Sequence, residues 1–172
     1  MTEVSATQRI QHLVDPEFSS GLGALDLDAL RAKRDECSSI EHAVSYTRRI
    51  TQGRFEILSA EQARRQEGGS RSDLIADLPR ILGEERGRSS APNARVSVTD
   101  EPLVEIDWGP RARLIDDDSL ANLDALDDDD LATAVVSLGD FERELSEYRR
   151  DLHQVLDAIE HEIATRAAAD VG

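Results

Sequence analysis

The chain has 172 residues, a formal net charge of −16 at pH 7 and an isoelectric point near 4.5. The phosphates of DNA or RNA would repel so acidic a protein, which argues against unaided nucleic-acid binding. The charge suits a basic partner, but without a motif the simpler interpretation is that it keeps the protein soluble. Aromatic residues make up only 3% of the chain and charged residues 33%, a composition too poor for a thick globular core but sufficient for a thin helical seam.

Cysteine usage and apolar runs narrow the class of protein further. Cys37 is the single cysteine, so the chain has neither a disulfide framework nor a thiolate metal site. Its place in a heptad seam predicts a buried residue rather than a nucleophile. No basic segment followed by an apolar run opens the sequence, and no stretch approaches the roughly 18 apolar residues of a membrane span. We therefore expect a cytoplasmic protein without a membrane partner.

A loose arm and then a long helix are predicted for the first part of the chain. Residues 1–26 mix Ser, Gly and isolated apolar residues and read as the arm. Residues 27–68 contain no Pro and are rich in helix formers, with Asp26 as a plausible N-cap and Gly68 with Gly69 as the stop.

Residues 69–126 are predicted to form an irregular linker between two long helices. Ser72 can cap a short helix that continues to Leu82. Apolar and polar residues then alternate from Val96 to Trp108, which leaves room for a small hairpin. Trp108 could either anchor that hairpin or touch a partner.

Residues 127–172 are predicted to form a second long helix with a short tail. The four aspartates Asp127–Asp130 lie where a helix N-terminus favours negative charge. We prefer this interpretation to a metal site, because a divalent-ion loop needs ligands at alternating positions and a Gly turn.

Both long helices carry a heptad seam of apolar residues. In the second helix the seam comprises Leu131, Leu138, Phe141, Leu145, Tyr148, Leu152, Val155 and Ile159. In the first helix a weaker seam comprises Leu30, Cys37, Ile40, Val44, Thr47, Thr51 and Leu58. Neither helix could bury its seam alone, so the sequence predicts an all-α fold whose two long helices pair as an intramolecular coiled coil. Spacing alone leaves parallel and antiparallel pairing open.

A five-residue polar pattern accompanies each seam. A shift of 101 residues aligns the seams and places Val44 on Leu145. The pattern then coincides in both helices, with spacings of four, three, four and four. The first copy is Glu41, Ser45, Arg48, Gln52 and Glu56, and the second is Glu142, Ser146, Arg149, His153 and Asp157. Charged helices often show such stripes for solubility, but two copies in the same heptad register favour two equivalent binding half-sites.

The chemistry of the pattern suits a guanine base. An arginine can donate two hydrogen bonds to O6 and N7 of guanine, and a carboxylate can accept from the N1 and N2 hydrogens on the opposite edge. Arginine also binds phosphate with two parallel bonds. Two half-sites suggest a ligand with two-fold symmetry and several guanines, a description that cyclic di-GMP meets.

The pattern resembles the motif of the RsiG family of actinobacterial anti-sigma factors: Glu, three residues, Ser, two, Arg, three, Gln, three, Asp. In that family each helix of an antiparallel coiled coil carries the motif, which binds a cyclic di-GMP dimer. The loaded protein holds the sporulation sigma factor WhiG inactive. The resemblance covers both helices, the linker and both copies of the pattern, and it alone favours antiparallel pairing here.

The resemblance implies a set of ligand-binding residues and two departures from the motif. The residues that match it are Glu41, Ser45, Arg48 and Gln52 in the first copy, and Glu142, Ser146, Arg149 and Asp157 in the second. Glu56 replaces the Asp of the motif with a longer carboxylate, and His153 replaces the Gln with another donor and acceptor. The implied function is cyclic di-GMP-dependent sequestration of a WhiG-like sigma factor.

Two other classes of function compete with this interpretation. An acidic coiled-coil adaptor without a nucleotide ligand would keep its partner after Arg48 and Arg149 are replaced by Ala, whereas a nucleotide sensor would not. An enzyme is disfavoured, because no Gly-rich phosphate loop is visible and the four histidines form no metal-ligand or acid–base constellation. Those histidines are His12, His42, His153 and His161.

Overall fold

The computed structural model of the chain describes residues 6–68, 106–116 and 123–169, together with residues 79, 102, 104 and 120. Apart from residue 79, the predicted short helix lies outside these residues, as does most of the predicted hairpin. In the described stretch 106–108, where strand-like alternation was noted, there is no regular secondary structure.

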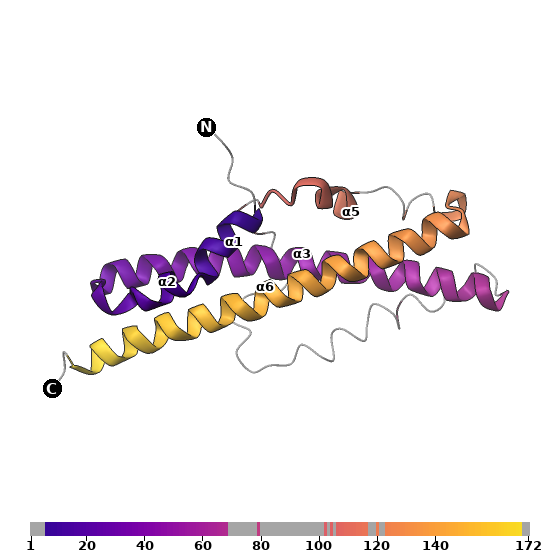
Figure 1. The fold of residues 1–172 in the computed structure, drawn as a ribbon. Helices are drawn as coiled ribbons and strands as arrows, with labels where there is room; N and C mark the ends of the chain where they lie inside the picture. Colours follow the sequence, from indigo (N-terminus) through magenta and orange to yellow (C-terminus); the bar gives the residue numbers. More distant parts are fainter. Residues whose placement is uncertain are drawn as a thin grey trace. The chain divides into compact units, whose positions relative to one another are not determined.

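The first long helix, α3, spans Leu27–Glu67 and appears in Figure 1 as an unbroken ribbon. The Oδ1 atom of Asp26 accepts a hydrogen bond of 2.8 Å from the backbone N–H of Ala29, which satisfies one of the donors left open at a helix start. Gly68 follows the helix with φ of 69°, a conformation that glycine adopts without strain. The predicted helix, cap and stop are confirmed.

The second long helix, α6, spans Asp128–Ala169, again as predicted (Figure 1). The Oδ1 atom of Asp127 accepts from the backbone N–H of Asp130 at 2.8 Å, so Asp127 caps α6 as Asp26 caps α3. Residues Asp128 to Asp130 form an acidic first turn. The structure thus places these aspartates at the start of α6, where the helix dipole favours negative charge.

The chain divides into two compact units. Unit 1 comprises Met1–Tyr46, Glu101–Pro110 and Glu144–Gly172, and unit 2 comprises Thr47–Asp100 and Arg111–Arg143. Each unit therefore contains part of α3 and part of α6.

Unit 1 contains three short elements that the sequence interpretation missed. They are α1 (Ala6–Val14), α2 (Pro16–Ser20) and the 3-10 turn η1 (Leu22–Ala24). The Oδ1 atom of Asp15 accepts from the backbone N–H of Glu17 at 2.8 Å, and Pro16 occupies the first helical position, so a local cap starts α2.

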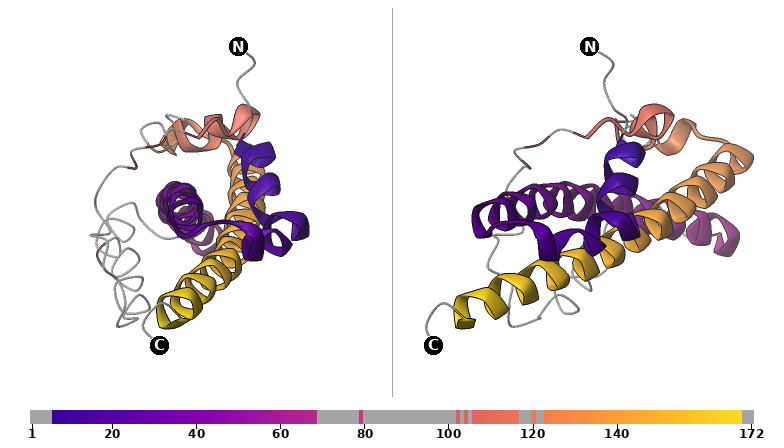
Figure 2. Two further views of the ribbon diagram at one scale, coloured as in Figure 1. Left: turned by 90° about the vertical axis from the view of Figure 1, so that its left-hand side faces the viewer. Right: turned by 60° about the vertical axis from the view of Figure 1, so that its left-hand side comes forward.

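The apolar residues of these short elements are buried, so a loose arm was the wrong expectation for residues 6–24. The buried residues are Ile10, Leu13, Phe18 and Leu22. The ammonium of Lys33 in α3 lies 3.6 Å from the ring centroid of Phe18, and Figures 1 and 2 show the two short helices leading into α3. Helices this short carry too few turns for their periodicity to be read from the sequence.

Within unit 1, α3 and α6 contact each other in opposite order. The guanidinium of Arg166, near the end of α6, donates to the carbonyl of Leu25, just before α3. Further along, the thiol of Cys37 donates to the carbonyl of Leu152 at 3.8 Å. Contacts therefore move forward along α3 as they move backward along α6, and the two helix segments run in opposite directions in this unit.

Unit 2 has its own apolar cluster with the same opposed order of helix segments. Leu58, Leu131 and Leu138 are buried at its centre, and partly buried apolar residues surround them, namely Phe55, Leu114, Leu120, Leu123, Ala134 and Val135. Gly139 allows the close approach of Phe55, because a Cβ at Gly139 would lie 3.1 Å from Cε2 of that ring. Leu114 belongs to α5 (Ala112–Asp116), which follows the turn η2 (Gly109–Arg111), and Leu123 to the turn η4 (Leu123–Ala125).

The predicted seams are buried at every position except one. Tyr148 is half-buried, and its hydroxyl donates to Oε1 of Glu144 at 2.7 Å. Among the others, a fully buried Leu or Ile stabilises the fold by about 1.5–3 kcal/mol. Packing of α3 against α6 in each unit is thus confirmed; their supercoiling as a coiled coil remains a prediction.

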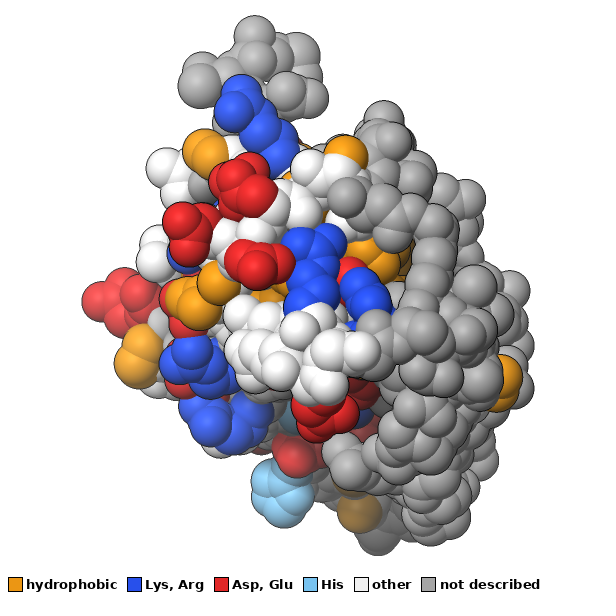
Figure 3. Space-filling model, turned by 90° about the vertical axis from the view of Figure 1, so that its right-hand side faces the viewer, with side chains coloured by type: hydrophobic (Ala, Val, Ile, Leu, Met, Phe, Trp, Pro, Cys, Tyr) orange, Lys and Arg blue, Asp and Glu red, His pale blue; other side chains and the backbone are white. Residues whose placement is uncertain are grey.

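Helix and turn account for all regular structure within the described ranges. None of the helices in those ranges is apolar enough over a sufficient length to cross a bilayer. Basic and acidic side chains are interspersed on the face drawn in Figure 3.

Candidate functional site

The polar residues of the repeated pattern form two clusters, one in each unit. Cluster 1, in unit 1, comprises Glu41, Ser45, Arg149 and His153. Cluster 2, in unit 2, comprises Arg48, Gln52, Glu56 and Glu142. Helical periodicity brings side chains four residues apart together on one helix, and the packing of α3 on α6 adds the contacts between helices.

Cluster 1 is centred on the carboxylate of Glu41. Its Oε1 atom accepts from the hydroxyl of Ser45 at 2.6 Å and from Nε of Arg149 at 3.3 Å. Nε2 of His153 lies 3.0 Å from the same oxygen, and Nε of Arg149 also donates to Oγ of Ser45 at 3.0 Å. Two residues of α3 and two of α6 thus share one hydrogen-bonded network.

Cluster 2 is centred on the guanidinium of Arg48. Its Nη1 atom donates to Oε1 of Gln52 at 2.7 Å and to Oε1 of Glu142 at 3.1 Å. Nε2 of Gln52 donates in turn to Oε1 of Glu56 at 3.0 Å. The other oxygen of Glu56, Oε2, is buried and has no hydrogen-bond partner within the described ranges.

Each cluster combines residues from both copies of the pattern, so neither copy forms a cluster by itself. Glu41 and Ser45 of the first copy bind Arg149 and His153 of the second, whereas Arg48 of the first copy binds Glu142 of the second. A complete copy extends over fifteen residue steps, or about 22 Å of helix, too long for its ends to touch. The opposed direction of α3 and α6 supplies nearer partners.

The remaining two residues of the pattern lie on α6 in unit 1. Ser146 is half-buried and Asp157 is exposed. All ten residues of the pattern are therefore placed, and eight of them belong to the two clusters.

Exposure distinguishes the two arginines. The side chain of Arg149 is 45% exposed, and both of its hydrogen bonds to described residues use Nε, so its Nη groups can meet a ligand. The side chains of Arg48 and Glu142 are each only 23% exposed. A ligand can reach the guanidinium of Arg149 with less rearrangement than that of Arg48.

Cys37 behaves as a seam residue. Burial, together with the nearby carboxylates of Glu41 and Glu36, raises the pKa of its thiol to about 12. A thiol that stays protonated at neutral pH is a poor nucleophile and a poor metal ligand. Its predicted burial is confirmed.

Arg65 and Arg166 are further polar residues in contact with distant parts of the chain, and the sequence interpretation did not identify them. Both bind backbone carbonyls of turns that lie more than fifty residues away in the sequence. The shift of 101 residues that aligns the seams also aligns these two arginines. Extending that alignment past the seams could have identified them.

Comparison with known proteins bears directly on this site. Residues 16–82 match the RsiG-like family. The matched region covers 67 of the 172 residues of the chain. The match includes the first copy of the pattern and stops before the second. No curated protein matches the chain.

This match suggests an anti-sigma factor role, which would be regulatory rather than enzymatic and would have a sigma factor as its partner. The family is one of nucleotide-binding regulators.

Proposed function

We propose that this RsiG-like chain is a cytoplasmic, cyclic di-GMP-dependent anti-sigma factor. It would sequester a WhiG-like, sporulation-type sigma factor and so repress transcription. The observation that carries the proposal is the pair of clusters, since each joins an arginine of one helix to a glutamate of the other. The pairs Arg149–Glu41 and Arg48–Glu142 are counterparts under the shift of 101 residues.

Each cluster offers the groups that recognise guanine. The Nη groups of Arg149 can donate to O6 and N7, and the carboxylate of Glu41 can accept from the N1 and N2 hydrogens. In cluster 2, Oε2 of Glu56 is a buried acceptor without a donor in the described ranges. A buried carboxylate oxygen without a donor costs free energy, which a guanine N–H would offset. Two such clusters suit a cyclic di-GMP dimer, and the ten residues of the pattern are its proposed contacts.

The net charge supports the choice of partner. A sigma factor presents basic DNA-binding surfaces, and a chain with a net charge of −16 complements them. In this proposal the bound nucleotide forms part of the interface and bridges the two proteins.

Calorimetric titration of cyclic di-GMP into the purified chain, with and without the WhiG-like sigma factor, tests the proposal. Saturable binding is expected, and Arg149→Ala should abolish most of it. Arg150→Ala is the matched control, because Arg150 is the neighbouring arginine, 65% exposed and paired only weakly with Asp151 at 3.5 Å.

The same titrations distinguish the nucleotide-dependent anti-sigma factor from an adaptor that has no nucleotide ligand. If the chain binds the sigma factor equally well without nucleotide, and Arg48→Ala with Arg149→Ala leaves that complex intact, the chain is an acidic adaptor. If wild-type protein binds cyclic di-GMP in neither titration, the nucleotide-dependent mechanism is refuted.

A further inference from the structure

An arginine near the C-terminal end of each long helix binds the turn that precedes the other long helix. Arg65 of α3 binds the turn before α6 in unit 2, and Arg166 of α6 binds the turn before α3 in unit 1. Neither arginine belongs to the repeated polar pattern.

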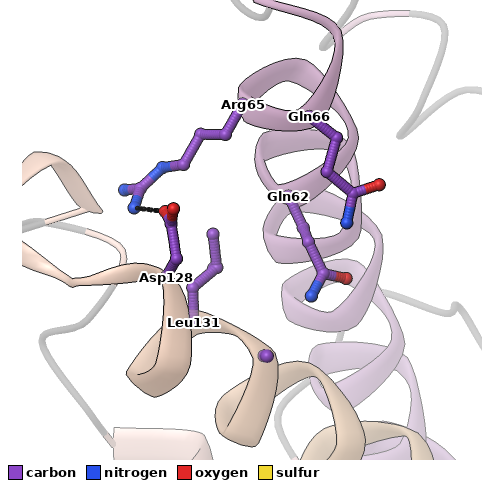
Figure 4. Close-up of a pocket in the computed structure, with 6 residues that line it drawn as sticks. Gln62, Arg65, Gln66, Asp128 and Leu131 are labelled. Carbon is purple, nitrogen blue, oxygen red and sulfur yellow. Dashed lines mark hydrogen bonds and ion pairs between the residues drawn. The ribbon is translucent and has the colours of Figure 1, made fainter.

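The guanidinium of Arg65 makes hydrogen bonds to four different residues. Nη2 donates to the carbonyl of Leu123 at 2.9 Å, and Nη1 donates to the carbonyl of Leu126 at 2.8 Å and to Oδ1 of Asp128 at 2.9 Å. Nε donates to Oε1 of Glu61 at 2.7 Å. Figure 4 shows Arg65 reaching from α3 to Asp128 at the start of α6, at the edge of a pocket.

Glu61 holds the guanidinium of Arg65 in place. Its side chain is only 3% exposed and also binds Arg64, whose Nε and Nη2 atoms each lie 2.7 Å from a carboxylate oxygen. Hydrogen bonds from Arg64 and Arg65 lower the pKa of Glu61 to about 2. The carboxylate is therefore ionised at neutral pH and fixes the orientation of the Arg65 fork.

The guanidinium of Arg166 makes the corresponding bonds in unit 1. Nη1 donates to the carbonyl of Leu25, and Nη2 donates to the carbonyls of Leu22 at 3.2 Å and Gly23 at 2.9 Å. Nε donates to Oε1 of Glu162 at 2.7 Å. The shift of 101 residues that aligns the motif copies also relates the members of the two sets. It relates Arg65 to Arg166 and Glu61 to Glu162, and it relates Leu22 and Leu25 to Leu123 and Leu126.

We propose that Arg65 and Arg166 are positioning residues that set the register of α3 against α6 in their respective units. We call each arginine, with its glutamate and its carbonyl partners, an end lock. By fixing register, the end lock of unit 2 brings Arg48 to Glu142, and the end lock of unit 1 brings Arg149 to Glu41.

The seams alone specify register weakly. A slip of one heptad again places apolar residues on apolar residues, while it displaces one helix by about 10 Å. A guanidinium has five N–H donors in a rigid fork, so carbonyls displaced that far cannot be bound. The end locks therefore penalise slipped registers that the apolar seams tolerate.

Spin-label distances test the end lock of unit 2. Labels at the exposed positions Ala63 and Thr133, in a Cys37→Ala background, report on α3 and α6 within that unit. Arg65→Ala is expected to broaden the distance distribution and add a component displaced by about 10 Å. Arg65→Lys, which keeps the charge but loses the fork, should lie between wild type and Arg65→Ala. Arg143→Ala is the matched control, because among the described residues Arg143 pairs with Asp140 on its own helix.

Hydrogen exchange separates a local lock from a general loss of stability. Arg65→Ala should increase amide exchange in residues 123–126 and leave residues 22–25 unchanged, whereas Arg166→Ala should do the reverse. Equal increases in both turns, or distances in Arg65→Ala that match those of Arg143→Ala, would overturn the proposal. If Arg65→Ala loses its helical circular dichroism, Arg65→Lys and Arg166→Ala decide by the same criteria, with labels at Glu36 and Gln154 for unit 1.

Only the consequence for ligand binding rests on the proposed function. Because the locks align the clusters, Arg65→Ala and Arg166→Ala should each weaken cyclic di-GMP binding by at least tenfold. If wild-type protein binds no cyclic di-GMP, the proposed function fails, while the distance and exchange measurements still test the end locks.

Discussion

Clusters 1 and 2 use corresponding residues of the two helices but differ in exposure and in the group at one position. In cluster 1 the arginine is 45% exposed and bonds through Nε, and His153 fills the fourth position of the pattern. In cluster 2 the arginine is 23% exposed, shares Nη1 between two acceptors, and has Gln52 as its neighbour. The same pattern thus gives a more exposed arginine in one unit and a more buried, ion-paired arginine in the other.

Arg149→Ala is the strongest way to test this difference. Because the Nη groups of Arg149 are accessible, the substitution should lower cyclic di-GMP affinity by about 10- to 100-fold. It should change the free energy of unfolding by less than about 1 kcal/mol, since exposed ion pairs contribute little. Calorimetry and urea unfolding measure the two effects, with Arg150→Ala as the control. If Arg149→Ala instead lowered the free energy of unfolding strongly and left the affinity unchanged, Arg149 would be a structural residue and not a ligand contact.

Replacing each glutamate with glutamine compares the two end locks. The pKa of Glu61 is lowered from 4.5 to about 2, so its stabilising effect is complete above about pH 4.5 and is lost as pH falls toward 2. Glu61→Gln should cost about 2 kcal/mol at pH 7 and make the decline below pH 4.5 shallower. Glu162→Gln should cost less, because Glu162 is 30% exposed and binds one arginine. Equal losses of unfolding free energy for the two variants at pH 7 would mean that the deeper burial of Glu61 adds nothing to the stability of unit 2.

Arg48→Ala tests how much the ion pair of cluster 2 contributes to stability. Removing the guanidinium leaves Glu142 partly buried without this partner, which should cost about 1–2 kcal/mol of unfolding free energy. A double-mutant cycle with Glu142→Gln isolates the contribution of the pair. An interaction energy near zero would mean that the Arg48–Glu142 pair does not stabilise the fold despite its partial burial.

His153→Gln makes the fourth position of the two clusters alike and should have the smallest effect. Glutamine keeps a donor for Glu41, as Gln52 does for Glu56. Affinity for cyclic di-GMP at neutral pH should therefore change by less than about threefold, or under 0.7 kcal/mol. A change as large as that of Arg149→Ala would show that histidine itself is required at this position.

Much of the fold could be predicted because its signals are local. Asp26 and Asp127 mark helix starts, Gly68 marks a stop, and heptad spacing marks the residues that are buried. The short helices α1 and α2 could not be predicted in this way, because they depend on burying residues such as Phe18 against the rest of unit 1. Tyr148 follows the seam in spacing but is only half-buried, since its hydroxyl binds Glu144.

The sequence by itself determined the two long helices, the cap of the first, all but one of the buried seam residues and the ten polar residues beside the seams. Only the tertiary structure decided that Glu41 meets Arg149 and that Arg48 meets Glu142. It also decided that these two pairs differ in exposure and that Arg65 and Arg166 bind distant turns. The physical reason is that periodicity places residues on a face of one helix, whereas direction and register determine which residues of the other helix they meet.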